Sequence, residues 1–335
     1  MESGIIALKN YSWSDVDWNA LRRLRERFLQ FDETPGGGDY WKSERELASY
    51  DFTFAERIGW KWDAVLAELR TRGWTPPEGT VLDWGCGTGV AGRRVITEWR
   101  TSSQKLLVTD RSRSAEHFAI RRARESFPGL PVERADANAA PPALLVISHV
   151  LNELPPGSDA LERLLTLASQ AQAVLWVEPG TAAVSRRLIA ARARLMPHLR
   201  PVAPCPHPLE CGLLSAGNER HWCHHFAKAP REVFQDAGWG RFAKLLEIDL
   251  GSVPFSFLVL DRRPLSVSTA SRVIGEPRHY KGYAKILTCR EEGVQELTLQ
   301  KRDDPEGLKA IKKDPGSLYE WNVEGDKIRG GERVF

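Results

Sequence analysis

The chain has 335 residues, a net charge of +3, and contents of 42% hydrophobic and 27% charged residues. These values are typical of a globular protein with two or three domains. No apolar run approaches the ~20 residues that span a bilayer, and residues 1–6 lack the pattern of a secretory signal or an organelle transit peptide. We therefore expect no membrane partner and a cytoplasmic location. The odd number of cysteines, 5, argues against a disulfide framework.

Residues 1–78 are predicted to form an N-terminal helical region. Residues 18–29 place Trp18, Leu21, Leu24 and Phe28 along one helical stripe. Residues 43–71 predict one or two further helices. A Pro-Pro-Glu-Gly sequence at residues 76–79 then ends the region.

From residue 79 the pattern changes to strands that alternate with helices. Such alternation indicates an α/β fold with a doubly wound, mostly parallel sheet. A hairpin of residues 245–248 and 255–260 is expected to close this sheet. The predicted domain covers residues 79–263, with a cysteine-rich insertion at about 200–228. Its other strands are at 80–84, 106–110, 144–148 and 173–178, and its helices at 91–99, 114–127 and 159–171.

Residues 264–335 have a different character. Short strands are predicted at 283–287 and 296–299, with glycine and proline between them and one helix at 306–313. We expect a small β-rich, barrel-like C-terminal domain.

A glycine loop follows the first predicted strand. Asp83 precedes Gly85, Gly87 and Gly89, and glycines at such a turn let a ligand approach the backbone closely. A carboxylate beside the loop suits S-adenosylmethionine, which carries a cationic amino group and a sulfonium. The rival is a dinucleotide site, because residues 87–92 match G-x-G-x-x-G. That reading leaves Asp83 and Gly85 unexplained, and a carboxylate would repel a pyrophosphate.

Further cofactor-binding candidates follow the next strands. Asp110 ends the second strand, where a carboxylate can accept hydrogen bonds from ribose hydroxyls. Asp136 is placed to read the adenine, although a loop aspartate that caps a turn is an equal alternative. His149 and Asn152 follow the fourth strand and are expected near the methionine end or a substrate.

A catalytic residue is not identifiable from the sequence. The segment after the fourth strand contains no Asn/Asp-Pro-Pro-aromatic motif, which would indicate methylation of an exocyclic base nitrogen. It also contains no cysteine that could act as the nucleophile for methylation of pyrimidine C5. The sequence therefore predicts a cofactor site more strongly than any particular methyl transfer.

Three cysteines, Cys205, Cys211 and Cys223, occur at the spacing C-x5-C-x11-C, and Cys289 lies in the C-terminal domain. Thiolates from dispersed loops suit an iron–sulfur cluster, whereas structural zinc typically uses closer C-x2-4-C pairs. Zinc and unliganded core cysteines remain alternatives. Alternative zinc ligands are His207, His221, His224 and His225.

Two segments are rich in basic residues, a pattern typical of phosphate binding to nucleic acid or of a solvated charged face. One is a predicted helix over residues 185–195 followed by Arg200, and the other is the C-terminal domain. They contain Arg186, Arg187, Arg192 and Arg194 in the helix, and Lys281, Lys285, Lys301, Arg302, Lys309, Lys312 and Lys313 in the C-terminal domain.

Residues 50–62, 82–89, 148–154, 177–181 and 204–207 together resemble the methyltransferase-like assembly-factor family of the small ribosomal subunit, bacterial and mitochondrial. The resemblance covers nearly the whole chain. It implies a class I methyltransferase (Rossmann-like) fold, binding to small-subunit ribosomal RNA or a pre-ribosomal particle, and S-adenosylmethionine. It also implies a 4Fe-4S cluster on four cysteines. The implied cluster ligands are Cys205, Cys211, Cys223 and Cys289.

Three functions remain open at this point. The first is an RNA methyltransferase and the second a non-catalytic RNA-binding assembly factor that uses the cofactor structurally. The third is a zinc-containing small-molecule methyltransferase.

Overall fold

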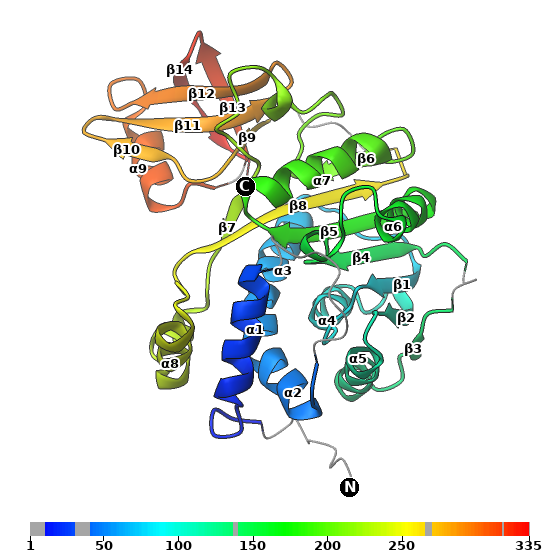
Figure 1. The fold of residues 1–335 in the computed structure, drawn as a ribbon. Coiled ribbons are helices and arrows are strands. Elements are labelled where there is room, and N and C mark those ends of the chain that lie inside the picture. Colours follow the sequence, from blue (N-terminus) through cyan, green and yellow to red (C-terminus); the bar gives the residue numbers. More distant parts are fainter. Residues whose placement is uncertain (1–10, 31–40, 137–139, 265–269, 317, 335) are drawn as a thin grey trace, which may run out of the picture.

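A computed structural model describes residues 11–30, 41–136, 140–264, 270–316 and 318–334 (Figure 1). Residues 1–6, on which the expectation about targeting signals rests, lie outside these ranges. Within them, no helix has both the length and the apolar character that crossing a membrane requires.

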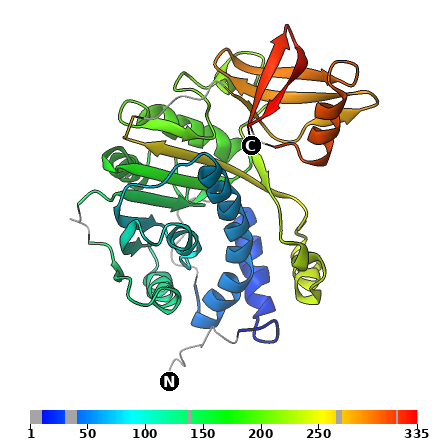
Figure 2. The same ribbon diagram turned by 180° about the vertical axis from the view of Figure 1, so that it is seen from behind.

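Three helices form the N-terminal region, as the periodicity predicts: α1 (Trp18–Gln30), α2 (Glu44–Phe52) and α3 (Phe54–Thr71). Ser43 caps α2 by accepting a hydrogen bond from the amide of Glu46, a favourable arrangement at a helix start. Helix α3 contacts α4 and β8 and is buried along much of its length. This region therefore packs against the neighbouring α/β domain, beside its sheet (Figures 1 and 2).

The α/β domain is built on an eight-stranded sheet in the order β3-β2-β1-β4-β5-β8-β6, with β7 also paired to β8. Strands β1 to β5 run parallel, and β8 lies antiparallel between β5 and β6. The order and the inserted antiparallel strand are those of class I methyltransferases, so the predicted fold class is confirmed. The strands are β1 (Gly79–Trp84), β2 (Ser103–Thr109), β3 (Val132–Arg134), β4 (Leu144–Ser148), β5 (Ala173–Pro179), β6 (Arg200–Ala203), β7 (His225–Ala227) and β8 (Val253–Asp261).

Alternate residues of each strand enter two different hydrophobic clusters, as the period of a strand requires. Leu144 and Val146 join the cluster that includes residues of α3, α4 and α5, whereas Leu145 and Ile147 join the cluster of α6 and α7. Helices therefore cover both faces of the sheet (Figure 1). These helices are α4 (Val90–Glu98), α5 (Arg113–Ser126), α6 (Asp159–Gln170) and α7 (Ala182–Leu195).

The predicted closing hairpin is wrong in one of its two strands. Residues 255–260 lie in β8, but Leu245 and Leu246 end helix α8 (Ala237–Leu246). Trp239, Phe242 and Leu246 are the buried residues of this helix, and their spacing of three and four residues is helical. β6 and β7 flank β8 instead.

The C-terminal domain is a barrel (Figure 1). Starting from β9, the pairings run through β11, β12, β14 and β13 and return to β9. Ala284, Ile286, Leu297 and Leu299 fill the interior. Its elements are β9 (Ser271–Val273), β10 (Arg278–Tyr280), β11 (Tyr283–Arg290), β12 (Gly293–Gln300), α9 (Pro305–Lys313), β13 (Leu318–Glu324) and β14 (Lys327–Arg333).

A buried ion pair joins the barrel to the N-terminal helices. Arg272 of β9 is 2% exposed and donates a hydrogen bond to the carboxylate of Glu68 in α3. The same guanidinium lies 3.2 Å from Nδ1 of His225 in β7. Three parts of the chain that are distant in sequence therefore meet at one charged contact.

Candidate functional site

The glycine loop turns the chain from β1 into α4 with three left-handed residues. Gly85, Gly87 and Gly89 have φ values of 68°, 52° and 79°, which L-residues with a Cβ adopt only at a cost. A Cβ on Gly85 would also lie 2.6 Å from Cγ1 of Val150. The glycines thus satisfy both the turn and the close approach of the segment after β4.

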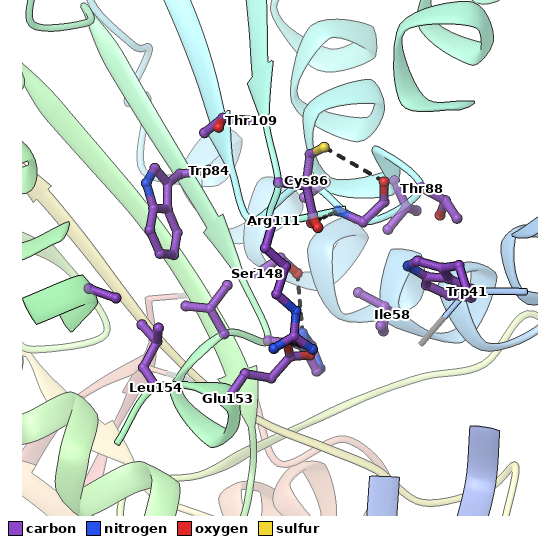
Figure 3. Close-up of a pocket in the computed structure, with 18 of the residues that line it drawn as sticks. Trp41, Ile58, Trp84, Cys86, Thr88, Thr109, Arg111, Ser148, Glu153 and Leu154 are labelled. Atoms are coloured by element: carbon purple, nitrogen blue, oxygen red, sulfur yellow. Dashed lines mark hydrogen bonds and ion pairs between the residues drawn. The ribbon is translucent and has the colours of Figure 1, made fainter. Parts of the chain in front are cut away.

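A cavity of about 500 Å³ opens beside this loop, at the carboxyl ends of β1, β2 and β4 (Figure 3). Ligands of doubly wound sheets bind at this edge. Trp41, Tyr50 and Ile58 of the N-terminal region line part of it, so the region contributes to the site. The lining also includes Trp84, Gly85, Cys86, Gly87, Thr88, Val90, Ala91, Thr109, Asp110, Arg111, Ser148, His149, Val150, Glu153, Leu154, Pro155, Ser158 and Ala160.

Asp83 lies behind the loop and does not line the cavity. Its carboxylate is fully buried, and Oδ2 accepts a hydrogen bond of 2.9 Å from the amide of Gly92 in α4. Oδ1 has no hydrogen-bond partner among the described residues. Burial raises the pKa of this carboxyl to about 7, because an isolated charge is poorly solvated in the interior. Gly89, the N-terminal cap of α4, also lies outside the lining.

Asp110 lies at the cavity wall and fixes the glycine loop. Its Oδ2 accepts a hydrogen bond of 2.8 Å from the amide of Gly87, and its Oδ1 accepts one of 2.9 Å from Ser112. Burial raises the pKa of Asp110. The next residue, Arg111, forms an ion pair of 3.0 Å with Glu153 across the cavity (Figure 3).

His149 lies at the same cavity with a strained backbone, φ 57°. Its Nε2 is 2.9 Å from Nζ of Lys61 in α3, and its Nδ1 is 3.2 Å from Oγ of Ser148. Trp62 donates a hydrogen bond to the same Ser148 hydroxyl. Burial lowers the pKa of Lys61 to about 7, and burial and the charge of Lys61 lower the pKa of His149. The pair can therefore hold or release a proton near neutral pH.

Glu178 supports the segment that carries His149. Its Oε1 accepts hydrogen bonds from the amides of Val150 and Leu151 and from the indole of Trp176. Burial raises the pKa of Glu178 to about 7. The carboxyl group thus holds the turn after β4 in place through its backbone amides.

Sequence reasoning and the cavity lining differ at several positions. Gly85, Gly87, Asp110 and His149 come together, whereas Asn152 lies in the short helix Leu151–Glu153 outside the lining. Asp136 is exposed and is not part of the lining either. Arg111, Tyr50 and Trp41 line the cavity, and Lys61 contacts His149, but no sequence motif indicated these four residues. A lysine between two buried tryptophans was the available signal for Lys61.

Three of the four cysteines of the predicted metal site pack on one apolar cluster between the two domains. Cys211, Cys223 and Cys289 pack on an apolar cluster formed by Ile189, Leu213 and Ile274. Burial raises the pKa of these three thiols, and the neighbouring charge of Cys205 raises each of them further. The shared apolar cluster brings Cys211, Cys223 and Cys289 together, although they come from residues 211–223 and from β11.

Two arginines face these thiols from the protein interior. Arg192 of α7 and Arg272 of β9 are 4% and 2% exposed, and both lower the pKa of Cys289 against the effect of burial. Arg192 also donates hydrogen bonds to the carbonyls of His207 and Leu209. The site therefore combines sulfur donors with buried positive charge, which suits an anionic group.

The histidines proposed as alternative ligands take different positions. Nε2 of His207 is 3.5 Å from Sγ of Cys289, and Nε2 of His225 is 3.7 Å from Sγ of Cys223. His224 stacks on Trp222, and His221 accepts a hydrogen bond from Arg220. In the described ranges, no three His, Cys, Asp or Glu side chains are placed to hold a metal ion.

The arginines of α7 have intramolecular partners, which differs from the predicted role in phosphate binding. Arg187 donates to the carbonyls of Leu151 and Leu154, and Arg186 donates to those of Glu219 and His221. Arg194 pairs with Glu162, and Arg192 is buried as described. This helix therefore uses its charges to hold the cysteine segment and the turn after β4.

Solved methyltransferases share only a distant likeness with the chain. Magnesium protoporphyrin IX methyltransferase (ChlM) from Synechocystis PCC 6803 with bound SAM is 12% identical, with a TM-score of 0.38, over 74% of this chain and 97% of that one. Precorrin-6y C5,15-methyltransferase from Geobacter metallireducens GS-15 is 10% identical, with a TM-score of 0.35, over 60% and 87%. No curated protein matches significantly.

A family match covers most of the chain. The model of the family described as "Mitochondrial small ribosomal subunit Rsm22" matches residues 56–320, a range that includes the glycine loop, the cavity residues after β4 and all four clustered cysteines. The chain therefore belongs to the Rsm22 family.

Proposed function

We propose that this protein binds S-adenosylmethionine and acts with the small ribosomal subunit as a methyltransferase-like factor. The cavity at the glycine loop carries the proposal, because it combines a close backbone approach with a carboxylate at the end of β2. Asp110 would accept hydrogen bonds from the ribose hydroxyls, and Gly85 and Gly87 would face the methionine part. When bound, the cofactor supplies an electrophilic methyl group.

His149 at the cavity wall and Lys61, which contacts it from α3, are groups that can handle protons. Methyl transfer to an N–H or O–H group releases one proton, and Lys61 with His149 can accept it. No residue of the cavity is identified as a nucleophile. Non-catalytic use of the cofactor by an RNA-binding assembly factor is therefore the second candidate, and small-subunit ribosomal RNA or a pre-ribosomal particle is the proposed partner of both.

We further propose that Cys205, Cys211, Cys223 and Cys289 hold a 4Fe-4S cluster. Support comes from the packing of Cys211, Cys223 and Cys289 on one apolar cluster, with Arg192 and Arg272 as counter-charges. Cys205 raises the pKa of all three thiols. Cluster potentials and stability depend on such charges and on solvent exposure. Because Cys289 belongs to the barrel, the cluster would also join the two domains. Zinc is the alternative metal. The cytoplasmic location stays a prediction.

Calorimetric titration with S-adenosylmethionine tests the cofactor proposal, and labelled methyl transfer to small-subunit ribosomal RNA separates the enzyme from the non-catalytic factor. Absence of cofactor binding would overturn the first proposal. Binding without methyl transfer would favour the second candidate.

Anaerobic purification followed by iron, sulfide and zinc analysis tests the metal. We expect iron and sulfide in the wild type and their loss in Cys223→Ser. Cys86→Ser is the matched control, because Cys86 lies at the cofactor cavity. A colourless protein with stoichiometric zinc would overturn the iron–sulfur assignment.

A further inference from the structure

The barrel has the strand order of an oligonucleotide-binding fold. If its strands are counted from β9 and the added strand β10 is left aside, the ring runs first, second, third, fifth, fourth and back to first. The third and fifth strands, β12 and β14, pair in parallel, and α9 lies between β12 and β13. In this fold, ligands bind on the face of the second and third strands, beside the loop that joins the first two.

The cysteine site covers one half of that face. Cross-strand pairing places Leu287 opposite Glu296 and Cys289 opposite Val294. Leu287, Cys289 and Val294 pack against the apolar cluster of the cysteine site. A Cβ on Gly212 would lie 2.6 Å from the amide of Val294, so the cysteine segment closely contacts β12. This half is occupied by the protein itself.

The other half of the face is open. Tyr283 lies opposite Gln300, and Lys285 lies opposite Thr298. A shallow depression of about 560 Å³ lies here, lined by Gly282, Tyr283, Gln300, Lys301, Arg302 and Pro305. The loop between the first two strands includes β10, which forms a hairpin with β11 beside this half.

An aromatic pair extends from the open half. The rings of Tyr280 and Tyr283 are 4.7 Å apart and 10° from parallel. Tyr280 is 47% exposed and belongs to the exposed large apolar side chains of the described structure. A flat, exposed aromatic surface of this kind can stack on a nucleobase.

Positive charge surrounds the aromatic pair. Lys281 and Lys301 are exposed and form no ion pair within the described part of the chain. Arg278 and Lys285 share one carboxylate, that of Glu296. The open half therefore has more cations than carboxylates, which favours a polyanion over an oligosaccharide.

From this arrangement we infer that the open half of the barrel face binds single-stranded RNA. The residues of this surface are Tyr280, Lys281, Tyr283, Lys285, Lys301 and Arg302. Bases stack on Tyr280, and the lysines contact the phosphates. The inference rests on the proposed association with ribosomal RNA and specifies its strandedness and its surface. It is independent of the cofactor cavity, whose lining contains no barrel residue.

Fluorescence anisotropy of the full-length protein with a labelled single strand of about 16 ribonucleotides, and with its annealed duplex, tests this assignment. We expect tighter binding of the single strand. Tyr280→Ala should weaken it at least about fivefold, because base–aromatic stacking is lost, while Tyr280→Phe should retain it. Lys281→Glu with Lys301→Glu should lower the salt dependence by about 1.4 in logarithmic slope.

Arg22→Glu with Lys244→Glu is the matched control. It makes the same charge change at exposed positions of α1 and α8, far from the barrel (Figure 1). Circular dichroism and thermal unfolding verify that each variant is folded.

If the wild type binds the single strand and Tyr280→Ala binds it equally well, this surface is not the binding site, but the proposed association with RNA is retained. Preference for the duplex also overturns it. If the protein binds neither the single strand nor the duplex, both this inference and the proposed association with RNA are overturned. Equal losses in the charge variant and its control would show general electrostatic attraction and reject this surface.

Discussion

The cofactor cavity and the cysteine site differ in how much of the chain builds them. Most of the cavity comes from a compact stretch of strands and loops between β1 and α6, with a few residues from the N-terminal helices. The cysteine site needs α7, the segment 205–223 and the barrel strand β11. The cavity lining therefore includes no barrel residue, whereas the cysteine site forms only when the barrel is joined to the α/β domain.

The two sites should therefore respond to different substitutions. Changes within the glycine loop should act on ligand binding and leave the domains joined. Changes at the charged contact of Arg272 should act on the joining of the domains and leave the cavity residues in place. Four substitutions test this separation.

Arg272→Leu should have the largest effect. It removes the guanidinium that binds Glu68 and contacts His225 in the interior. Removing one partner of a buried ion pair typically costs about 3–5 kcal/mol, and Arg72 retains part of the pairing with Glu68. We expect the free energy of unfolding, measured in urea, to fall by about 3 kcal/mol. Arg329→Leu breaks an ion pair whose arginine side chain is 37% exposed, so it should lower the free energy of unfolding by less than about 1 kcal/mol. Equal losses would contradict the separation.

Asp83→Asn should change the pH dependence of stability. The pKa of Asp83 is raised to about 7 in the fold, so between its unfolded pKa of about 4 and pH 7 the folded state binds more protons. Its contribution is present below pH 4 and is lost as the pH rises through 7. Asparagine keeps an acceptor for the Gly92 amide and removes this loss. Unfolding free energies from pH 4 to 8 should fall less steeply in the variant; unchanged slopes would exclude Asp83 as their source.

Gly85→Ala should weaken S-adenosylmethionine binding roughly tenfold, equivalent to about 1.4 kcal/mol. The new Cβ would meet Val150 and displace the turn after β4. Gly129→Ala is the control, because its φ is also positive, at 83°, but its Cβ would have nothing within 4 Å. Calorimetry should show unchanged cofactor affinity in that control. A similar loss of affinity in both variants would mean that backbone strain, not cavity shape, decides.

Arg111→Gln should have the smallest effect on stability. Its ion pair with Glu153 is partly exposed, and such pairs contribute about 0.2–1 kcal/mol. Because the pair crosses the cavity, we expect faster cofactor release, measured by stopped-flow fluorescence. Arg70→Gln breaks an exposed pair with Glu98 that lies outside the cavity lining and should leave release unchanged. An unchanged rate in Arg111→Gln would show that the pair does not retain the ligand.

The sequence predicts the α/β fold because each strand and each glycine turn is determined by a few consecutive residues. It fails at residues 245–248 because a short apolar run fits a helix and a strand equally well. There, Trp239 and Phe242 decide the outcome by packing as parts of a helix.

At the candidate sites, local sequence indicated Gly85 and Gly87, which share one turn, and Asp110, which directly follows the next strand. It missed Lys61, because its partner His149 lies 88 residues away. The proximity of Cys289 to the other three cysteines also depends on the folded arrangement of two domains. Only the family resemblance indicated it in advance.

The contact between Glu68 and Arg272 has a consequence for the protein during its own synthesis. The two residues are 204 positions apart, so a nascent chain that has completed β8 still lacks the arginine that covers Glu68. The apolar residues Ile189 and Leu213 likewise lack their packing partner Ile274 until that residue has been synthesised. A chain terminated before the barrel would expose these groups, so premature termination there should yield an aggregation-prone fragment that chaperones and proteases recognise.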